Sequence, residues 1–438
     1  MAHNFTAHNQ SFDLKALEEA LSVKTDDSKK SDIQIVHKPT LPGWMKDNNC
    51  SFVITSYKSH MVIFLGVRND AIYTYSMMQE RPTGIGLKDD MLYVSNIGNI
   101  ITYVNRGSID TPLNGTYDAN FCVKNINAGA HIDVHDIDIG VGADKIYGDD
   151  IFIADFKKEH AYEAETRMQF GPNIPDYMNR SISDRTIYYC STGLNSICMP
   201  SDKYTCEIYW TPPWIKLNDK GHPPNEDRCH LNGLCCVDGK PKYVTAVCMR
   251  DYLGAWQEHM DEGVLYNVVE NKIVCSKLIM PHSPRVYREK IWLLESGTGY
   301  FGYVEGGKFI KKTFLPGFLR GLDFIGKFAV ICTSLDRHDH AFRDTPVSRK
   351  LKQDGRDSKC GIWVINLETF EIESYIHFSD MKELYDIKII QNCQTPRILG
   401  MTDSVVWKNL YLPQLFKKVE QKPPPLLEKG EQKLPVDS

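Results

Sequence analysis

Three histidines stand where strand-like segments begin, an unusual place for an ionisable side chain. His135 begins "HDIDIG", His230 begins "HLNGLCCV" and His282 lies in "MPHSPRVY". Neutral imidazoles that converge on one point can bind a transition metal such as zinc, iron or copper. Partly protonated imidazoles can instead bind a carboxylate or phosphate, or transfer protons near neutral pH. We expect such chemistry here if the fold brings the three histidines together.

The segments around these histidines follow a repeated pattern. Between residues 48 and 416, short β-branched and aromatic runs alternate with Gly, Asp and Asn turns, and helical periodicity is almost absent. The runs recur in a fixed order, which is typical of a repeat architecture. The units begin near Thr83, His135, His230, His282, Arg320 and Tyr385. The sequence therefore predicts an all-β fold, a β-propeller that is most simply six-bladed.

The last unit supplies a single strand, "YDIKII", near Tyr385. Three further strand-like runs lie at the other end of the region, in "CSFVITSYKSHMVIFLGVRNDAIYTY". Pairing these N-terminal strands with the last C-terminal strand would close the ring and leave no open sheet edge at the join. Seven blades are the alternative, and they need another blade within a Cys-containing insertion at about 157–210, where "TIYYCSTG" is a weak strand signal.

Polar segments flank and interrupt the predicted propeller. Residues 1–47 and the Pro/Lys/Glu-rich tail 417–438 have the composition of disordered chain. A second, polar insertion covers about 336–359. We expect protein partners, if there are any, to bind through these insertions and tails, because loops commonly carry binding groups.

The first strand of a propeller blade is the innermost, so the residues that begin it line the central channel. The candidate catalytic residues are His135, His230, His282 and Glu295, and the three histidines are also the candidate metal ligands. The candidate ligand-binding residues are Arg320, Asn232, Arg285, Tyr385 and Asp386. A small-molecule or metal site at this mouth is the first hypothesis, and whether it is enzymatic stays open. The alternative is a non-catalytic protein-interaction scaffold whose channel histidines hydrogen-bond within the fold.

Composition excludes some partners and indicates a compartment. The 51 basic and 56 acidic residues give a formal charge of -5, and no run of Lys or Arg is long enough to follow a phosphate backbone. No run of about 18 apolar residues and no secretory signal core is present. Several of the 13 cysteines lie in apolar strand-like runs, where a free thiol behaves as a small hydrophobe in a reducing compartment. We expect a soluble, cytoplasmic protein that binds neither nucleic acid nor membranes.

An ordered series of motifs resembles a large, mostly bacterial family of conserved hypothetical proteins that is catalogued only as a domain of unknown function. The motifs are "ERPTGIGL", "DVHDIDIG", "EDRCHLNGLCCVDGKPKYVTAV", "MPHSPRVY", "IWLLESGTG", "LPGFLRGLDF" and "CGIWVINLETFEI". The resemblance covers about residues 50–395 and implies a propeller-like domain without supplying a reaction. It marks as characteristic His135, Asp136, His230, Asn232, Gly233, His282, Ser283, Pro284, Arg285, Gly317, Arg320 and Gly321. The Cys-rich insertion and the polar tails depart from the family pattern.

Overall fold

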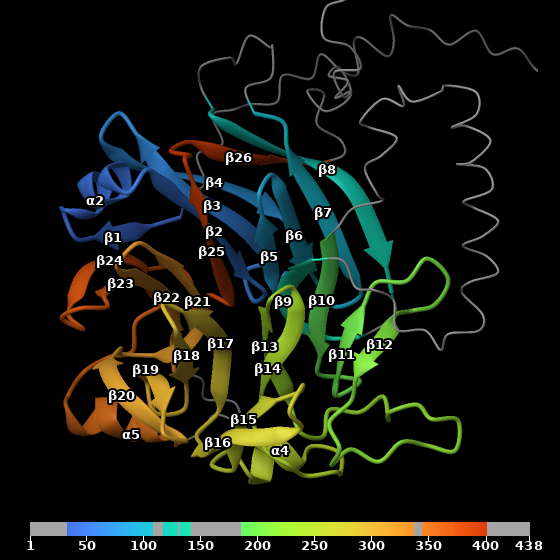
Figure 1. Ribbon diagram of the computed structural model, residues 1–438. Coiled ribbons are helices and arrows are strands. Elements are labelled where there is room, and N and C mark those ends of the chain that lie inside the picture. Colours follow the sequence, from blue (N-terminus) through green and yellow to red (C-terminus); the bar gives the residue numbers. More distant parts are fainter. Residues whose placement is uncertain (1–32, 108–116, 130–131, 142–184, 337–343, 401–438) are drawn as a thin grey trace, which may run out of the picture. The chain divides into compact units, whose positions relative to one another are not determined.

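The computed structural model describes residues 33–107, 117–129, 132–141, 185–336 and 344–400. These residues form six sheets of four or five strands each. The innermost strands are β5 (Ile85–Lys88), β9 (Val134–Val141), β13 (Leu231–Val237), β17 (Pro281–Tyr287), β21 (Phe318–Ile325) and β25 (Asp386–Gln391). Each inner strand contacts the next, and β25 contacts β5, so the sheets close a ring (Figure 1). The predicted six-bladed β-propeller is confirmed.

We number the blades by their inner strands, starting with β5. Blade one continues with β6 (Met91–Ser95), β7 (Asn99–Asn105) and β8 (Ala119–Ala128), and blade two with β10 (Arg185–Ser191), β11 (Ser196–Met199) and β12 (Glu207–Trp210). Blade three continues with β14 (Lys240–Ala246), β15 (Gly263–Asn267) and β16 (Lys272–Leu278), and blade four with β18 (Lys290–Glu295), β19 (Tyr300–Glu305) and β20 (Lys308–Phe314). Blade five continues with β22 (Phe328–Ser334), β23 (Gly361–Asn366) and β24 (Ile372–Phe378), and blade six with β2 (Cys50–Ser56), β3 (Met61–Arg68) and β4 (Ala71–Met78).

Blade six joins the two ends of the propeller. Its inner strand β25 pairs with β2, with Phe52 opposite Ile389, so a strand from the C-terminal half completes a sheet of three N-terminal strands. Figure 1 shows this join as the red strand β25 beside the blue strands. Two further strands cover outer edges: β1 (Ile35–His37) pairs with β24, and β26 (Pro396–Leu399) pairs in parallel with β8. The predicted closure is confirmed.

Blade two corrects the predicted insertion at 157–210. Residues 185–210 contain β10, β11 and β12, which pair in order outward from β9. They complete blade two and do not form a seventh blade. The weak signal "TIYYCSTG" is a buried strand, in which Tyr188 and Tyr189 are almost fully covered. The rest of the predicted insertion, residues 157–184, lies outside the described residues.

The N-terminal boundary of the propeller also needs correction. Within the segment 1–47, β1 adds a strand to blade five, and helix α2 (Leu41–Asp47) buries Leu41, Trp44 and Met45 against blades five and six. Residues 1–32 and 401–438 lie outside the described part. In the polar insertion 336–359, helix α5 (Pro346–Gln353) is capped by the Thr345 hydroxyl, which accepts from the backbone N–H of Ser348. A short helix, α4 (Ala255–Glu258), lies between β14 and β15.

Hydroxyl groups link neighbouring blades at the histidine-bearing ends of the inner strands. Each lies at or just after the end of the second strand of a blade and donates to a backbone carbonyl where the next blade begins. The pairs are Thr55 to Thr83 (2.5 Å), Thr192 to Leu231 (3.1 Å), Ser296 to Leu319 (2.7 Å) and Ser334 to Leu384 (3.1 Å). These buried bonds satisfy polar groups that the sheets leave unpaired and fix each blade against the next.

Candidate functional site

Irregular strand starts position the site residues. The register of β13 shifts between Leu231 and Gly233, that of β17 between His282 and Arg285, and that of β21 at Gly321. Such bulges bend a strand and redirect its side chains. Gly321 has φ +62°, and a Cβ there would lie 2.8 Å from the backbone nitrogen of Ile387 in the next blade. Only glycine fits this close approach without strain.

A small cavity of about 10 Å³ lies where these starts meet. We call it and its lining the histidine end of the channel. Its lining includes six of the predicted site residues: His135, Asn232, His282, Arg320, Tyr385 and Asp386. A volume of this size holds about one water molecule or one ligand atom group. The structure therefore assembles most of the predicted site, around a nearly filled cavity.

His282 is hydrogen-bonded at both ring nitrogens. Its Nδ1 lies 3.0 Å from the carbonyl oxygen of Met280 and 3.0 Å from the Ser296 hydroxyl. Because a carbonyl oxygen can only accept, Nδ1 carries the proton and Nε2 is the acceptor. The Asn232 amide lies 3.2 Å from Nε2 and donates to it. With both nitrogens engaged, His282 is held as a neutral imidazole within the fold.

His230 lies in a ring stack next to His135. Its ring centroid is 4.3 Å from that of Trp256, and 4.8 Å from that of His135 in an edge-to-face arrangement. Its Nδ1 lies 2.8 Å from an Asp227 carboxylate oxygen. His230 therefore contacts one of the other two channel histidines, His135. Its own hydrogen bond fixes it to the loop before blade three.

His135 lies between charged and ionisable neighbours. Its Nδ1 is 2.6 Å from the hydroxyl of Thr192. Burial, the His230 imidazole, the Arg320 guanidinium and the His282 imidazole, in that order, lower the pKa of His135 well below its usual value. The His135 imidazole is therefore neutral at neutral pH while the site holds no anion.

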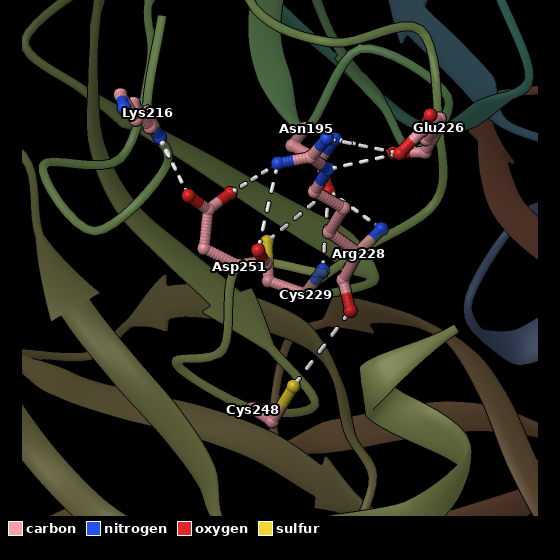
Figure 2. A network of polar contacts seen from close by, with 7 residues as sticks. All are labelled: Asn195, Lys216, Glu226, Arg228, Cys229, Cys248 and Asp251. Carbon is pink, nitrogen blue, oxygen red and sulfur yellow. Dashed lines mark hydrogen bonds and ion pairs between the residues drawn. The ribbon is translucent and has the colours of Figure 1, made fainter. Parts of the chain in front are cut away.

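Figure 2 shows the contacts that fix the segment leading into His230. The Asn195 side chain, in the turn between β10 and β11, accepts from the backbone N–H of Arg228 (3.0 Å) and donates to the carbonyl of Glu226 (2.7 Å). The Arg228 guanidinium pairs with the Glu226 carboxylate at 2.9 Å and with Asp251 at 2.8 Å. A turn of blade two thus holds the entry to blade three and places His230 beside His135.

Arg320 is the buried cation of the histidine end. It is 5% exposed, and its guanidinium carbon lies 4.5 Å from the ring centroid of Tyr385 and 5.6 Å from that of Phe318. Among the described residues its guanidinium has no hydrogen-bond or ion-pair partner, and its Nε is fully buried. The buried Tyr385 hydroxyl also has no partner there. Two strong polar groups are therefore left unsatisfied in one small cavity.

Asp386 carries the site's carboxylate. Its two oxygens accept from the backbone N–H groups of Ile387 (2.8 Å) and of Ile85 in blade one (2.8 Å). Burial nevertheless raises the pKa of this carboxyl to about 6. Asp386 therefore joins blade six to blade one and changes its charge close to neutral pH.

Glu295, a predicted catalytic candidate, is not part of this cavity. Its carboxylate accepts from the Thr298 hydroxyl (2.6 Å) and pairs with Lys311 on the outer strand of the same blade (2.8 Å). The prediction that Glu295 reaches the histidines is wrong, because its side chain is directed along its own blade to an outer-strand lysine.

Arg285 lines a different cavity from the predicted ligand site. Its guanidinium pairs with Asp136 through two bonds of 2.9 Å and donates to the Leu234 carbonyl (2.7 Å), which ties blades two, three and four together. Arg285 lines a second cavity of about 580 Å³, with Asp138, Asp323 and Lys388 among its other polar walls. It therefore serves as an inter-blade brace and not as part of the small cavity.

Sequence reasoning missed the groups that hold the histidines. Thr192 and Ser296 each follow the second strand of a blade and contact a channel histidine, while Asp227 and Trp256 hold His230. The repeated hydroxyl after a second strand was a readable signal for the first two. Trp256 gave none, because it lies in the short helix α4, far in sequence from the strand starts.

The arrangement does not form a metal centre. Within the described part of the chain, no three His, Cys, Asp or Glu side chains converge as metal ligands. Both ring nitrogens of His282 are hydrogen-bonded within the fold, so neither is free to bind a metal ion. The residues therefore do not fit zinc, iron or copper held by the three histidines.

One family model and several distant solved structures are similar to this chain. The family model described as Domain of unknown function (DUF4915) matches residues 39–153 and 174–399. A chain in the crystal structure of a nidogen/laminin complex is 10% identical, with 78% of this chain and 98% of that chain covered and a TM-score of 0.41. Apo AztD from Citrobacter koseri is 10% identical, with 78% of this chain and 86% of that chain covered and a TM-score of 0.32. A virginiamycin B lyase from Staphylococcus aureus is 9% identical, with 69% of this chain and 96% of that chain covered and a TM-score of 0.33. Likenesses this distant carry no argument about function. No curated protein matches the chain.

Among the described residues, no helix is long and apolar enough to cross a membrane.

Proposed function

Because the chain belongs to the family described as Domain of unknown function (DUF4915), whose description names no activity, we propose a function from the site itself. The propeller binds the anionic end of a small ligand, a carboxylate or a phosphate group, at the histidine end of the channel. The proposal concerns binding and assigns no reaction, since Glu295 pairs with Lys311 outside this cavity.

The unpaired guanidinium of Arg320 carries the proposal. Removing a charged group from water costs several kcal/mol unless an opposite charge and hydrogen bonds compensate. Arg320 is buried against two aromatic rings and has no acidic partner among the described residues. Its planar fork matches the oxygens of a carboxylate or phosphate, and the unpartnered Tyr385 hydroxyl offers a further donor.

The size of the cavity limits how much of the ligand enters. About 10 Å³ admits a single oxygen of a carboxylate or phosphate. The remainder of the ligand would stay outside the histidine end. Recognition by Arg320 would therefore select for the charged end of a ligand more than for its body.

Anion binding at this position would be coupled to proton uptake by His135. Arg320 is one of the groups that lower the pKa of His135. An anion that neutralises Arg320 removes part of this repulsion and adds attraction, so the pKa of His135 rises in the complex. Binding is then tighter at lower pH, because protonated His135 favours the bound state.

Calorimetric titration with phosphate and with acetate tests the proposal. Arg320→Gln should weaken binding by about 10- to 100-fold, since a hydrogen bond to a charged group contributes about 1.5–3 kcal/mol. Titrations in two buffers of different ionisation enthalpy should show protons taken up on binding to the unaltered chain. Arg356→Gln, which removes an equal charge from an exposed position, should bind like the unaltered chain. Equal affinity in the Arg320→Gln and unaltered chains would overturn the proposal.

A non-catalytic interaction scaffold is the second candidate, favoured by one observation. Both nitrogens of His282 are used within the fold, as expected for a structural histidine. On this reading neither anion binds, while His282→Ala lowers the free energy of unfolding by about 2–4 kcal/mol, because it leaves buried polar partners and a cavity. His222→Ala, at an exposed position, provides the control and should change stability by less than about 0.5 kcal/mol.

A further inference from the structure

Two cysteines lie near each other at the outer edge of blade two. Cys198 on β11 lies opposite Ile208 on β12. Cys206 comes directly before β12, which begins at Glu207. Both pack in one apolar cluster with Tyr189. The two thiols lie near enough for each to shift the pKa of the other.

The two thiols differ in exposure and acidity. Cys198 is fully buried, and its pKa is raised by the neighbouring Cys206 thiol and by burial. Cys206 is partly exposed, and the neighbouring Cys198 thiol lowers its pKa to about 7, with a smaller contribution from Tyr189. The thiolate is the nucleophilic form of cysteine, so Cys206 is the accessible, reactive member of the pair.

We propose that Cys198 and Cys206 are an oxidation site that forms a reversible disulfide when the protein meets a hydroperoxide. The Cys206 thiolate attacks one peroxide oxygen, the O–O bond breaks, and the leaving oxygen takes a proton and departs as water or an alcohol. Cys206 is now a sulfenic acid. The Cys198 sulfur then attacks the Cys206 sulfur, its proton and the sulfenic hydroxyl leave as water, and the disulfide forms. Two thiols have lost two electrons and the peroxide has gained them.

The new bond would act on a short edge strand. The residues between the two cysteines form a loop in which the Ser201 hydroxyl accepts from the backbone N–H of Tyr204 at 3.1 Å. Tyr204 itself is 61% exposed. A disulfide across this loop fixes β12, the outer strand of blade two, to β11. A thiol reductant releases it.

Peptide mapping of the full chain after treatment with hydrogen peroxide tests this site. Trypsin cleaves after Lys203, inside the loop, so a Cys198–Cys206 disulfide appears as a cross-link between peptides 186–203 and 204–216. The cross-link should be lighter than the two reduced peptides by two hydrogen atoms. It should disappear on reduction with dithiothreitol, and its rate of formation should rise with pH around neutrality.

Variants identify the roles of the two sulfurs. Cys198→Ser should leave a sulfenic acid on Cys206 that dimedone traps, whereas Cys206→Ser should give neither cross-link nor dimedone adduct. Cys190→Ser is the matched control, because Cys190 lies on peptide 186–203 and should not contribute. The unaltered chain alone can overturn the proposal. It is wrong if no cross-link forms, if the link uses Cys190, or if the buried Cys235 oxidises as fast as Cys206.

Discussion

In this propeller, the role of a buried ionisable residue depends on which groups of neighbouring residues contact it. Asp136 and Asp386 both lie on inner strands, yet Asp136 meets the guanidinium of Arg285 while Asp386 receives two backbone N–H groups and no ion pair with a described residue. Burial raises the pKa of the Asp386 carboxyl to about 6. The same residue type thus serves as a permanent brace in one blade and as a titrating link in another.

Asp386 should make the stability of the propeller depend on pH. The folded state holds a proton on this carboxyl more tightly than the unfolded chain does, because its pKa rises from 3.8 to about 6. Its stabilising contribution is full below pH 3.8 and is lost as pH rises through about 6, by about 3 kcal/mol in total. Urea unfolding at a series of pH values from about 4.5 to about 7.5 should show this decline in the unaltered chain.

Asp386→Asn should lose this pH-dependent component, since an amide does not titrate. Asp219→Asn, at an exposed position, should keep the slope of the unaltered chain. If the free energy of unfolding of Asp386→Asn depends on pH as it does in the unaltered chain, this carboxyl is not the source of the dependence.

The positions of most channel residues were predictable from sequence, but their partners were not. His135, His282, Arg320 and Tyr385 were placed correctly because the repeat fixes where each blade starts. Arg285 was not, because the register of β17 shifts between His282 and Arg285, and Arg285 lines the second cavity. A local shift of this kind depends on close contacts between blades, which no single strand pattern contains.

At the scale of elements, a hydroxyl after the second strand is the repeated link between blades. Ser296 is fully buried, donates to the Leu319 carbonyl of the next blade at 2.7 Å, and lies 3.0 Å from His282. A carbonyl left without this donor in the interior loses a hydrogen bond that water cannot replace. The link therefore serves both the packing of blades four and five and the orientation of a channel histidine.

Ser296→Ala should lower the free energy of unfolding by about 1–3 kcal/mol, because it leaves the Leu319 carbonyl unpaired. The unfolding midpoint in urea measures the change. Ser276→Ala removes an exposed hydroxyl from blade three and should change stability by less than about 0.5 kcal/mol. Equal effects of the two substitutions would mean that the inter-blade hydroxyl adds nothing to stability.

Strand order was predictable where the strands of a blade follow one another closely. Blade four was recognised because tight turns separate its four runs. In blade two, β9 ends at Val141 and β10 begins at Arg185. A pairing across so long an interval leaves no local turn signal, and "TIYYCSTG" therefore read as part of an insertion.

At the scale of the whole ring, the join in blade six decides whether the described chain folds as one unit. Strand β25 supplies the buried side chains Ile387 and Ile389 to the core that β2, β3 and helix α2 share. Burying one such side chain contributes about 1.5–3 kcal/mol, and domains are stable by only about 5–15 kcal/mol. Losing this one strand, with its hydrogen bonds to β2, is therefore comparable to the entire stability of the propeller.

A chain that ends after Leu384 should accordingly fail to unfold cooperatively. A chain that ends after Gly400 keeps every strand of the six described sheets, so it should melt in one transition. Adding a synthetic peptide of residues 385–400 to the shorter chain should restore the transition in a saturable manner, because β25 pairs along its whole length with β2. The same peptide with Ile387→Asp should not, since a buried charge at that position has no partner. Thermal melting followed by circular dichroism reports each case. A cooperative transition in the shorter chain without peptide would show that five blades and an incomplete sixth are sufficient, and that the join serves only to cover an edge.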